Sequence, residues 1–275
     1  MVCVAQPADI PALCQLFVQA FGGTVEMARQ VMEEFAGAGN VYLVRQEGGP
    51  VAMLCAVPVT LNGRKGAYYY GVCTDKSQQG KGIMSQMLKE VGEVLKGQGY
   101  AFATLIPASE SLFDFYAQRG FEKAMGLRCL QRPIRRNLWA QADFDAVTAR
   151  NLRLLRSKYA HNSVMLNDKG YVLVLTDLYS MGATIVSTDE GYGIYFKKDD
   201  ILDFVELFAE SDRAAENLME AARDKTGAEQ AQITLGASQN LFLGDGKPKD
   251  YGMISFFGEP FDVSESYMRL MLDME

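Results

Sequence analysis

Histidine is almost missing from this chain of 275 residues, because His161 is the only one. This argues against a nucleophile activated by histidine and against a metal site rich in histidine. The cysteines are few, and none has the spacing of a metal site or of a Cys-x-x-Cys redox motif. Their odd number and apolar surroundings indicate free, buried thiols in a reducing cytosol. These cysteines are Cys3, Cys14, Cys55, Cys73 and Cys129.

Long apolar runs and an excess of basic charge are also lacking. No run reaches the roughly 20 residues of a membrane-spanning helix, and the first residues have no basic segment typical of a secretion signal. We therefore expect a cytoplasmic protein with no membrane partner. The formal net charge of −7 argues against nucleic acid as the main partner. It is compatible with a cationic acceptor such as a polyamine, an aminoglycoside or lysine, although such a balance also simply favours solubility.

One stretch, residues 67–99, predicts a strand, a glycine-containing loop and a helix in succession. β-favouring residues run from Tyr68 to Thr74. Residues 79–82, Gln-Gly-Lys-Gly, interrupt them, and from Ile83 the apolar residues recur at helical spacing. A glycine loop at a helix start presents unpaired N–H groups, and the helix dipole adds about half a positive charge there. The stretch therefore predicts an anion site, most often one for phosphate.

Two common phosphate-binding motifs do not fit this loop. A Walker loop needs glycine where Asp75 stands, and it needs serine or threonine after Lys81, where Gly82 stands. A dinucleotide fingerprint needs a third glycine, and Ser85 occupies that position.

The loop instead resembles motif A of the GNAT acyltransferase superfamily, Gln/Arg-x-x-Gly-x-Gly/Ala. Residues 79–83 match in order, whereas Met84 replaces a small residue at the last position. In that family the loop binds the pyrophosphate of acetyl-coenzyme A (acetyl-CoA), and the preceding strand runs beside the pantetheine arm and the thioester. The resemblance therefore implies these acetyl-CoA-binding residues: Val72, Cys73, Thr74, Gln79, Gly80, Lys81, Gly82, Ile83, Met84 and Ser85.

A second match follows at residues 109–121, which resemble the family's helix Asn-x-x-Ala-x-x-φ-Tyr-x-x-φ-Gly-Phe, where φ is apolar. Tyr116, Gly120 and Phe121 fit, and Gln118-Arg119 is more polar than usual. The family's tyrosine often protonates the departing thiolate, so the resemblance implies that Tyr116 is a general acid. A phenol has a pKa of about 10 and a thiol one of about 8.5, so the transfer needs help from the site.

No motif marks a general base or a metal ligand, and we expect no metal. An amine with a pKa near 10.4 costs on the order of 4–5 kcal/mol to deprotonate at pH 7. A carboxylate or a chain of water molecules must help. The carboxylates possible by position are Asp75, Glu26, Glu33 and the chain end at Glu275.

The predicted elements of the first half follow the order of a GNAT fold. Helices are expected over residues 9–21, 24–35, 83–97 and 111–121, and strands over residues 40–46, 51–60, 68–74, 101–106 and 127–132. We therefore expect an α/β (α+β) fold with a mixed, mostly antiparallel central sheet flanked by helices. This first domain, residues 1–135, would hold the acyl-CoA site.

The second half, residues 140–275, repeats the plan without the glycine loop. Helices are expected over residues 144–159, 170–181 (also readable as a strand) and 214–226, and strands over 183–188, 193–197, 201–210, 231–236, 251–257 and 267–272. Glu210 and Asp212 would repel a pyrophosphate where the loop is missing. We infer a degenerate GNAT-like domain. Such a tandem pair resembles the Eis-type acetyltransferases, which carry a further sterol-carrier-like domain for which this chain is too short.

These resemblances imply an N-acyltransferase that moves an acetyl group from acetyl-CoA to an amine by direct attack. The acceptor would be a small molecule or a peptide, and the second domain could shape the acceptor cleft or form a homodimer surface. Two alternatives stay open. The protein could bind acyl-CoA without turnover, as a sensor or regulatory subunit, or it could be a scaffold with a vestigial loop.

Overall fold

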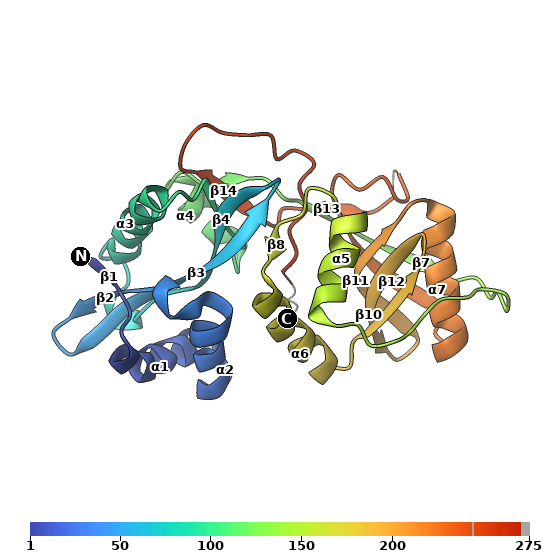
Figure 1. The fold of residues 1–275 in the computed structure, drawn as a ribbon, viewed down its shortest axis with the longest axis horizontal. Helices are drawn as coiled ribbons and strands as arrows, with labels where there is room; N and C mark the ends of the chain where they lie inside the picture. Colours follow the sequence, from blue (N-terminus) through green and yellow to red (C-terminus); the bar gives the residue numbers. More distant parts are fainter. Residues whose placement is uncertain (244, 271–275) are drawn as a thin grey trace. The chain divides into compact units, whose positions relative to one another are not determined.

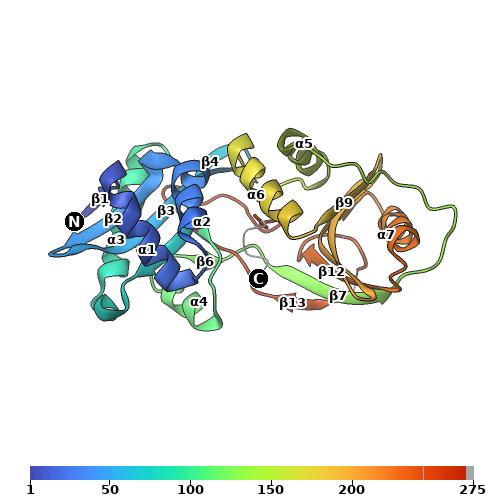
Figure 2. The same cartoon turned by 90° about the horizontal axis from the view of Figure 1, so that it is seen from below.

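The structure, a computed structural model, describes residues 1–243 and 245–270 and divides into two compact units (Figures 1 and 2). The first unit combines Met1–Lys123 with Gly252–Phe261, and the second combines Ala124–Tyr251 with residues 262–270. Each unit is a layered α/β structure with its own sheet and its own hydrophobic core. The α/β class and the mixed, mostly antiparallel sheets agree with the prediction.

The sheet of the first unit has the strand order β1-β2-β3-β4-β5-β14-β6. All neighbours are antiparallel except β4 and β5, which are parallel and joined by α3. The strands are β1 (Val2–Val4), β2 (Val41–Gln46), β3 (Gly49–Leu61), β4 (Arg64–Thr74), β5 (Phe102–Leu105), β6 (Glu122–Lys123) and β14 (Met253–Phe256). The helices are α1 (Ile10–Phe21), α2 (Val25–Gln30), α3 (Ile83–Gly97) and α4 (Glu110–Ala117). Short 3-10 turns at Pro7–Asp9, Ala38–Asn40 and Lys76–Gln78 and a π-helical segment at Val31–Gly37 complete the unit.

Helix α3 packs on one face of this sheet through the apolar residues that the sequence predicts. Met87, Leu88, Val91 and Leu95 are buried, and they form a core cluster with Tyr42 and other residues of β2 to β5. Each such side chain contributes roughly 1.5–3 kcal/mol relative to exposure. Helix α1 packs against β3 and β4, and Figure 1 shows α1 and α2 on the face opposite α3. The N-terminus of α3 is thereby held at the end of β4.

The second unit also contains two parallel strands joined by a helix, within a sheet that has the order β13-β7-β12-β11-β10-β9. Its one parallel pair, β11 and β12, is joined by α7, as β4 and β5 are by α3. The strands are β7 (Leu127–Pro133), β9 (Thr184–Thr188), β10 (Gly191–Lys198), β11 (Ile201–Ala209), β12 (Gln230–Gly236) and β13 (Lys247–Lys249). The helices are α5 (Ala149–Tyr159), α6 (Asp168–Ser180) and α7 (Asp212–Thr226), and Met165–Leu166 is a short strand, β8.

Two strands, β7 and β14, do not belong to the unit that their positions in the sequence suggest. Strand β7, expected to end the first domain, pairs with β12 over seven residue pairs. Strand β14, expected in the second half, pairs with β5 and β6. An apolar strand pattern specifies a pleated, half-buried segment but not the sheet edge that it covers. The units therefore divide near Lys123, with β14 returning to the first unit, rather than between residues 135 and 140.

Other differences from the predicted elements are local. The ambiguous stretch at residues 170–181 is helical, because Asn167 caps α6 by accepting from the Gly170 N–H at 2.9 Å. Helix α5 begins at Ala149 rather than near residue 144, with Thr148 as its cap. The sequence predicts a strand over residues 267–272. Among residues 267–270, only Tyr267 forms an isolated β-bridge, with Ser163. Residues 271–272 lie outside the described residues.

Candidate active site

The glycine loop, residues 79–82, adopts a backbone that requires glycine at two positions. Gly80 and Gly82 have φ values of 74° and 75°, a region that costs other L-residues roughly 1–2 kcal/mol. A Cβ atom at either position would meet nothing within 4 Å. The loop therefore faces open space, and the glycines serve the backbone conformation rather than tight packing.

The N-terminus of α3 is open, whereas that of α7 is closed. Gly82 caps α3 without any side-chain hydrogen bond, and the first helical bond runs from the Gln86 N–H to the Gly82 carbonyl at 3.0 Å. The N–H groups of Ile83, Met84 and Ser85 consequently lack intrahelical acceptors. At α7 the Ser211 hydroxyl accepts from the Ala214 N–H at 3.1 Å. Of the two equivalent helices, only α3 presents an uncapped, positive end.

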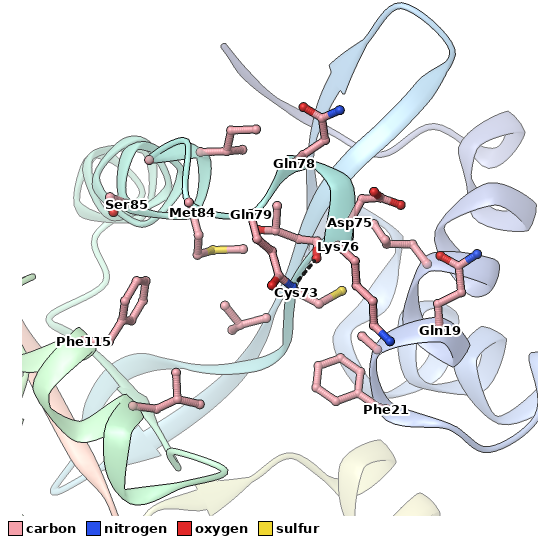
Figure 3. Close-up of a pocket in the computed structure, with 18 of the residues that line it drawn as sticks. Gln19, Phe21, Cys73, Asp75, Lys76, Gln78, Gln79, Met84, Ser85 and Phe115 are labelled. Carbon is pink, nitrogen blue, oxygen red and sulfur yellow. Dashed lines mark hydrogen bonds between the residues drawn. The ribbon is translucent and has the colours of Figure 1, made fainter.

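A pocket of about 610 Å³ lies in front of this end of α3 (Figure 3). All but one of the residues that the sequence predicts for acetyl-CoA or catalysis line it, namely Val72, Cys73, Thr74, Gln79, Gly80, Gly82, Ile83, Met84, Ser85 and Tyr116. Lys81 does not, because its ammonium donates to Gln78 Oε1 at 2.8 Å on the exposed side of the loop. Gln79 ties the loop to the end of β4 by donating from Nε2 to the Thr74 carbonyl at 3.1 Å, the bond dashed in Figure 3.

The strand that leads to the loop has a bulge and a partly open edge. Gly71 has a φ of 61° at an irregularity in the pairing of β3 with β4. Among the described residues, β5 pairs with β4 only at Gly66–Tyr68, although β4 continues to Thr74. The last residues of β4 therefore have no strand on their β5 side. An unpaired strand edge of this kind can bind an extended ligand through its backbone groups.

Tyr116 lies on α4 and lines the same pocket, with 7% of its surface exposed. No described residue forms a hydrogen bond with its hydroxyl group. Burial raises the pKa of Tyr116 to about 12, while nearby Arg119 opposes the rise. The phenol therefore keeps its proton at neutral pH and can donate it, or a hydrogen bond, to a ligand in the pocket.

Cys73 lines the pocket, but its thiol is chemically unreactive. Burial raises the pKa of Cys73 to about 12, and the thiolate is the form that reacts. At pH 8 the thiol should be alkylated by iodoacetamide at least tenfold more slowly than the exposed Cys3, because almost none of it is ionised. Peptide mass spectrometry after timed labelling measures this, and equal rates would contradict the assignment of Cys73 as a small strand residue.

The candidate bases within the described residues are poorly suited to take a proton from an amine in the pocket. Asp75 lines the pocket, but its carboxylate accepts from both the N–H and the hydroxyl of Ser77, at 2.8 and 2.6 Å, and these bonds lower its pKa. Glu33 pairs with Arg29 at 3.2 Å, and neither Glu33 nor Glu26 lines the pocket. Glu275 lies outside the described residues.

Arg119 is a pocket residue that the two motifs do not predict. It follows the end of α4, and its guanidinium donates to Ser85 Oγ from Nε at 2.9 Å and from Nη2 at 2.7 Å. The guanidinium also lies 3.5 Å from the centre of the Phe115 ring. It thus places a positive charge beside the first turn of α3. The sequence feature that could have pointed to Arg119 is the polar Gln118-Arg119 pair, because the family pattern is more apolar at this position.

Within residues 1–243 and 245–270, no group of three or more histidine, cysteine, aspartate or glutamate side chains could hold a metal ion. Over the same residues, no helix is both long enough and apolar enough to cross a bilayer.

Comparison with known proteins identifies the family of the first unit. The model of the GNAT acetyltransferase domain matches residues 3–124, and no curated protein matches the sequence. Two of the similar solved structures are a GCN5-related N-acetyltransferase from Anabaena variabilis (TM-score 0.74, 15% identity, 94% of this chain and 73% of that one) and Eis1 from Mycobacterium abscessus (TM-score 0.72, 14% identity, 94% and 74%). Another is a tandem GNAT protein from the clavulanic acid biosynthesis pathway (TM-score 0.55, 10% identity, 94% and 98%). Residues 3–124 therefore match a GNAT acetyltransferase domain, and the chain as a whole shares the fold of these solved structures, one of which is a tandem GNAT protein.

Proposed function

We propose that this protein is an N-acetyltransferase that transfers the acetyl group of acetyl-CoA to an amine of a small molecule or peptide. The observation that carries the proposal is the uncapped N-terminus of α3, which opens onto a pocket that Tyr116 also lines. A capped helix or a filled loop would not accept a diphosphate.

The residues present fit the donor. The N–H groups of Ile83, Met84 and Ser85 are without intrahelical acceptors, and each hydrogen bond to a charged oxygen contributes roughly 1.5–3 kcal/mol. The helix dipole and Arg119 add positive charge at the same end. The unpaired side of β4 offers backbone groups to the extended pantetheine arm. The donor supplies an acetyl thioester, whose carbonyl is the electrophile.

The reaction forms a bond from the amine nitrogen to the acetyl carbon and breaks the carbon–sulfur bond. The amine proton passes to solvent, because Asp75, the described candidate carboxylate that lines the pocket, has its pKa lowered by the hydrogen bonds from Ser77 and is a weak base. Tyr116 donates toward the leaving sulfur. Because its pKa is about 12 and that of a thiol is about 8.5, complete proton transfer costs roughly 5 kcal/mol. We therefore assign Tyr116 chiefly a hydrogen-bonding role until the thiolate has left.

The second unit is proposed to bind no donor. Ser211 caps α7, and Asp212 at its start accepts from the Phe242 N–H at 2.9 Å. A pyrophosphate would have to displace the serine and approach a carboxylate. We therefore expect one donor site per chain.

Calorimetric titration with acetyl-CoA tests the site, followed by an assay of thiol release with a panel of amines. Gly82→Leu should weaken donor binding at least tenfold, because its side chain would fill the mouth of the pocket. Gly99→Leu is the matched control: Gly99 also has a positive φ, of 79°, with nothing within 4 Å, but it does not line the pocket. The two variants should lose similar stability, and only the first should lose affinity.

Each other result has a definite meaning. Unchanged affinity in Gly82→Leu would refute the placement of the donor. Two sites per chain would refute the degenerate second unit. If acetyl-CoA bound but no amine led to thiol release, the protein would be an acyl-CoA sensor rather than an enzyme. If acetyl-CoA did not bind, the protein would be a scaffold.

A further inference from the structure

The pocket has a second side that the donor would leave free, and this inference rests on the function proposed above. If the donor occupies the glycine loop and the open side of β4, the acceptor enters opposite α3. That side is formed by the end of α1 and by the turn after β4, with the lining residues Leu16, Gln19, Ala20, Phe21, Asp75 and Lys76. Figure 3 shows the Lys76 side chain running toward Phe21, with Gln19 beside it.

Lys76 is the cation available to a ligand on this side. The charged side chains that line the pocket are Asp75, Lys76 and Arg119. Asp75 is bound by Ser77, and Arg119 is bound to Ser85. Among the described residues, Lys76 forms no ion pair. The acceptor side therefore offers an ammonium group that forms no ion pair with a described residue, next to the Asp75 carboxylate.

Phe21 gives the same side an apolar surface. Its side chain is 47% exposed, yet the ring is held in place by the buried Phe17, with 4.9 Å between ring centroids. Phe17 in turn contacts Tyr70 of β4, with 6.3 Å between ring centroids. A partly exposed ring on such a rigid support can pack against an apolar or aromatic group of a ligand.

We infer that the acceptor is an amine that also carries a carboxylate and an apolar or aromatic group, as an apolar amino acid does. Lys76 binds the carboxylate, with the Gln19 amide beside it, and Phe21 packs against the side group. A polyamine or an aminoglycoside could place one ammonium group against Asp75, but it would bring no carboxylate to Lys76. An acceptor that carries both an amine and a carboxylate can use both charged groups, whereas a purely cationic acceptor leaves Lys76 without a partner.

The test compares kcat/KM for phenylalanine and for phenylalaninamide, which lacks the carboxylate, in the parent protein and in variants. Lys76→Met should lower the ratio of the two values roughly tenfold, the size expected for a lost hydrogen bond to a charged group, and Lys76→Glu should lower it further. Comparing ratios between proteins removes the effect of the different basicity of the two amines. Lys89→Met, an exposed change outside the pocket, should leave the ratio unaltered.

A second arm addresses Phe21. Phe21→Ala should lower kcat/KM for phenylalanine several-fold more than that for glycine. An unchanged carboxylate ratio in Lys76→Met, or a parent enzyme that prefers spermidine, would overturn the inference. Failure of the proposed function is distinguishable, because it would abolish donor binding in calorimetry or thiol release with every amine.

Discussion

Replacing Glu206 with alanine should lower the free energy of unfolding of the second unit by about 3–5 kcal/mol, the range observed when one partner of a buried ion pair is removed. Glu206 on β11 and Arg156 on α5 are 0% and 1% exposed. Arg156 Nε donates to Glu206 Oε1 at 3.1 Å, and Nη2 bonds to Oε2. The alanine variant would leave a guanidinium buried without its counter-charge.

The cost is high because the carboxylate is the centre of a larger network. The Tyr192 hydroxyl donates to Oε1 at 2.7 Å, and the Tyr267 hydroxyl donates to Oε2 at 3.0 Å. Burial and the adjacent Glu206 raise the pKa of both phenols, so they keep the protons that they donate. Arg156 also binds the Arg269 carbonyl. One side chain therefore links α5, β10, β11 and the C-terminal segment.

Urea unfolding followed by circular dichroism measures the effect, and the same strand supplies a control. Asp203 on β11 pairs with Lys198 at 2.7 Å, but the lysine is 66% exposed. Asp203→Ala should cost less than about 1 kcal/mol, because solvent screens an exposed pair. If the Glu206 and Asp203 variants were equally stable, the buried network would contribute little to the fold.

Tyr116→Phe should lower kcat by about 10²-fold or more, the usual loss when one hydrogen-bond donor to a developing negative charge is removed, and should leave the affinity for acetyl-CoA within about twofold. The substitution removes one hydroxyl and keeps the ring that packs in the core cluster. Tyr100→Phe is the matched control, because Tyr100 belongs to the same cluster, is similarly buried, and does not line the pocket. A Tyr116→Phe variant that matched the parent would exclude the proposed hydrogen bond from Tyr116 to the leaving sulfur.

The pH dependence gives an independent check on Tyr116. Its active form is the protonated one, and burial raises its pKa to about 12. The activity that depends on this proton is therefore complete below pH 10 and is lost only as the pH rises toward 12. Up to about pH 10, the parent should therefore lose no kcat through ionisation of Tyr116, and the pH profiles of the parent and of Tyr116→Phe should have the same shape. A decline in kcat near pH 9 that is present in the parent and absent in Tyr116→Phe would mean that the pKa of Tyr116 is not raised.

Most of the candidate site could be predicted from the sequence because it is encoded in one short stretch. Strand β4, the glycine loop and the start of α3 are continuous in the chain, and glycine is the residue that tolerates the φ of 74–75° there. Tyr116 was accessible through a second local motif. Arg119 was not, because its partner Ser85 is 34 residues away and nothing in either segment specifies the other.

The same division applies to the fold. Periodicity, caps and turn residues are local signals: Thr24 caps α2, and Asn62-Gly63 forms the hairpin turn with φ values of 50° and 75°. Pairing across the chain is not local. The assignment of β7 and β14 to sheets, and the contact of Arg156 with Glu206 across 50 residues, depend on which edges and polar groups remain unsatisfied after the rest has packed. Those requirements arise only in the assembled structure, so no pattern within a single segment records them.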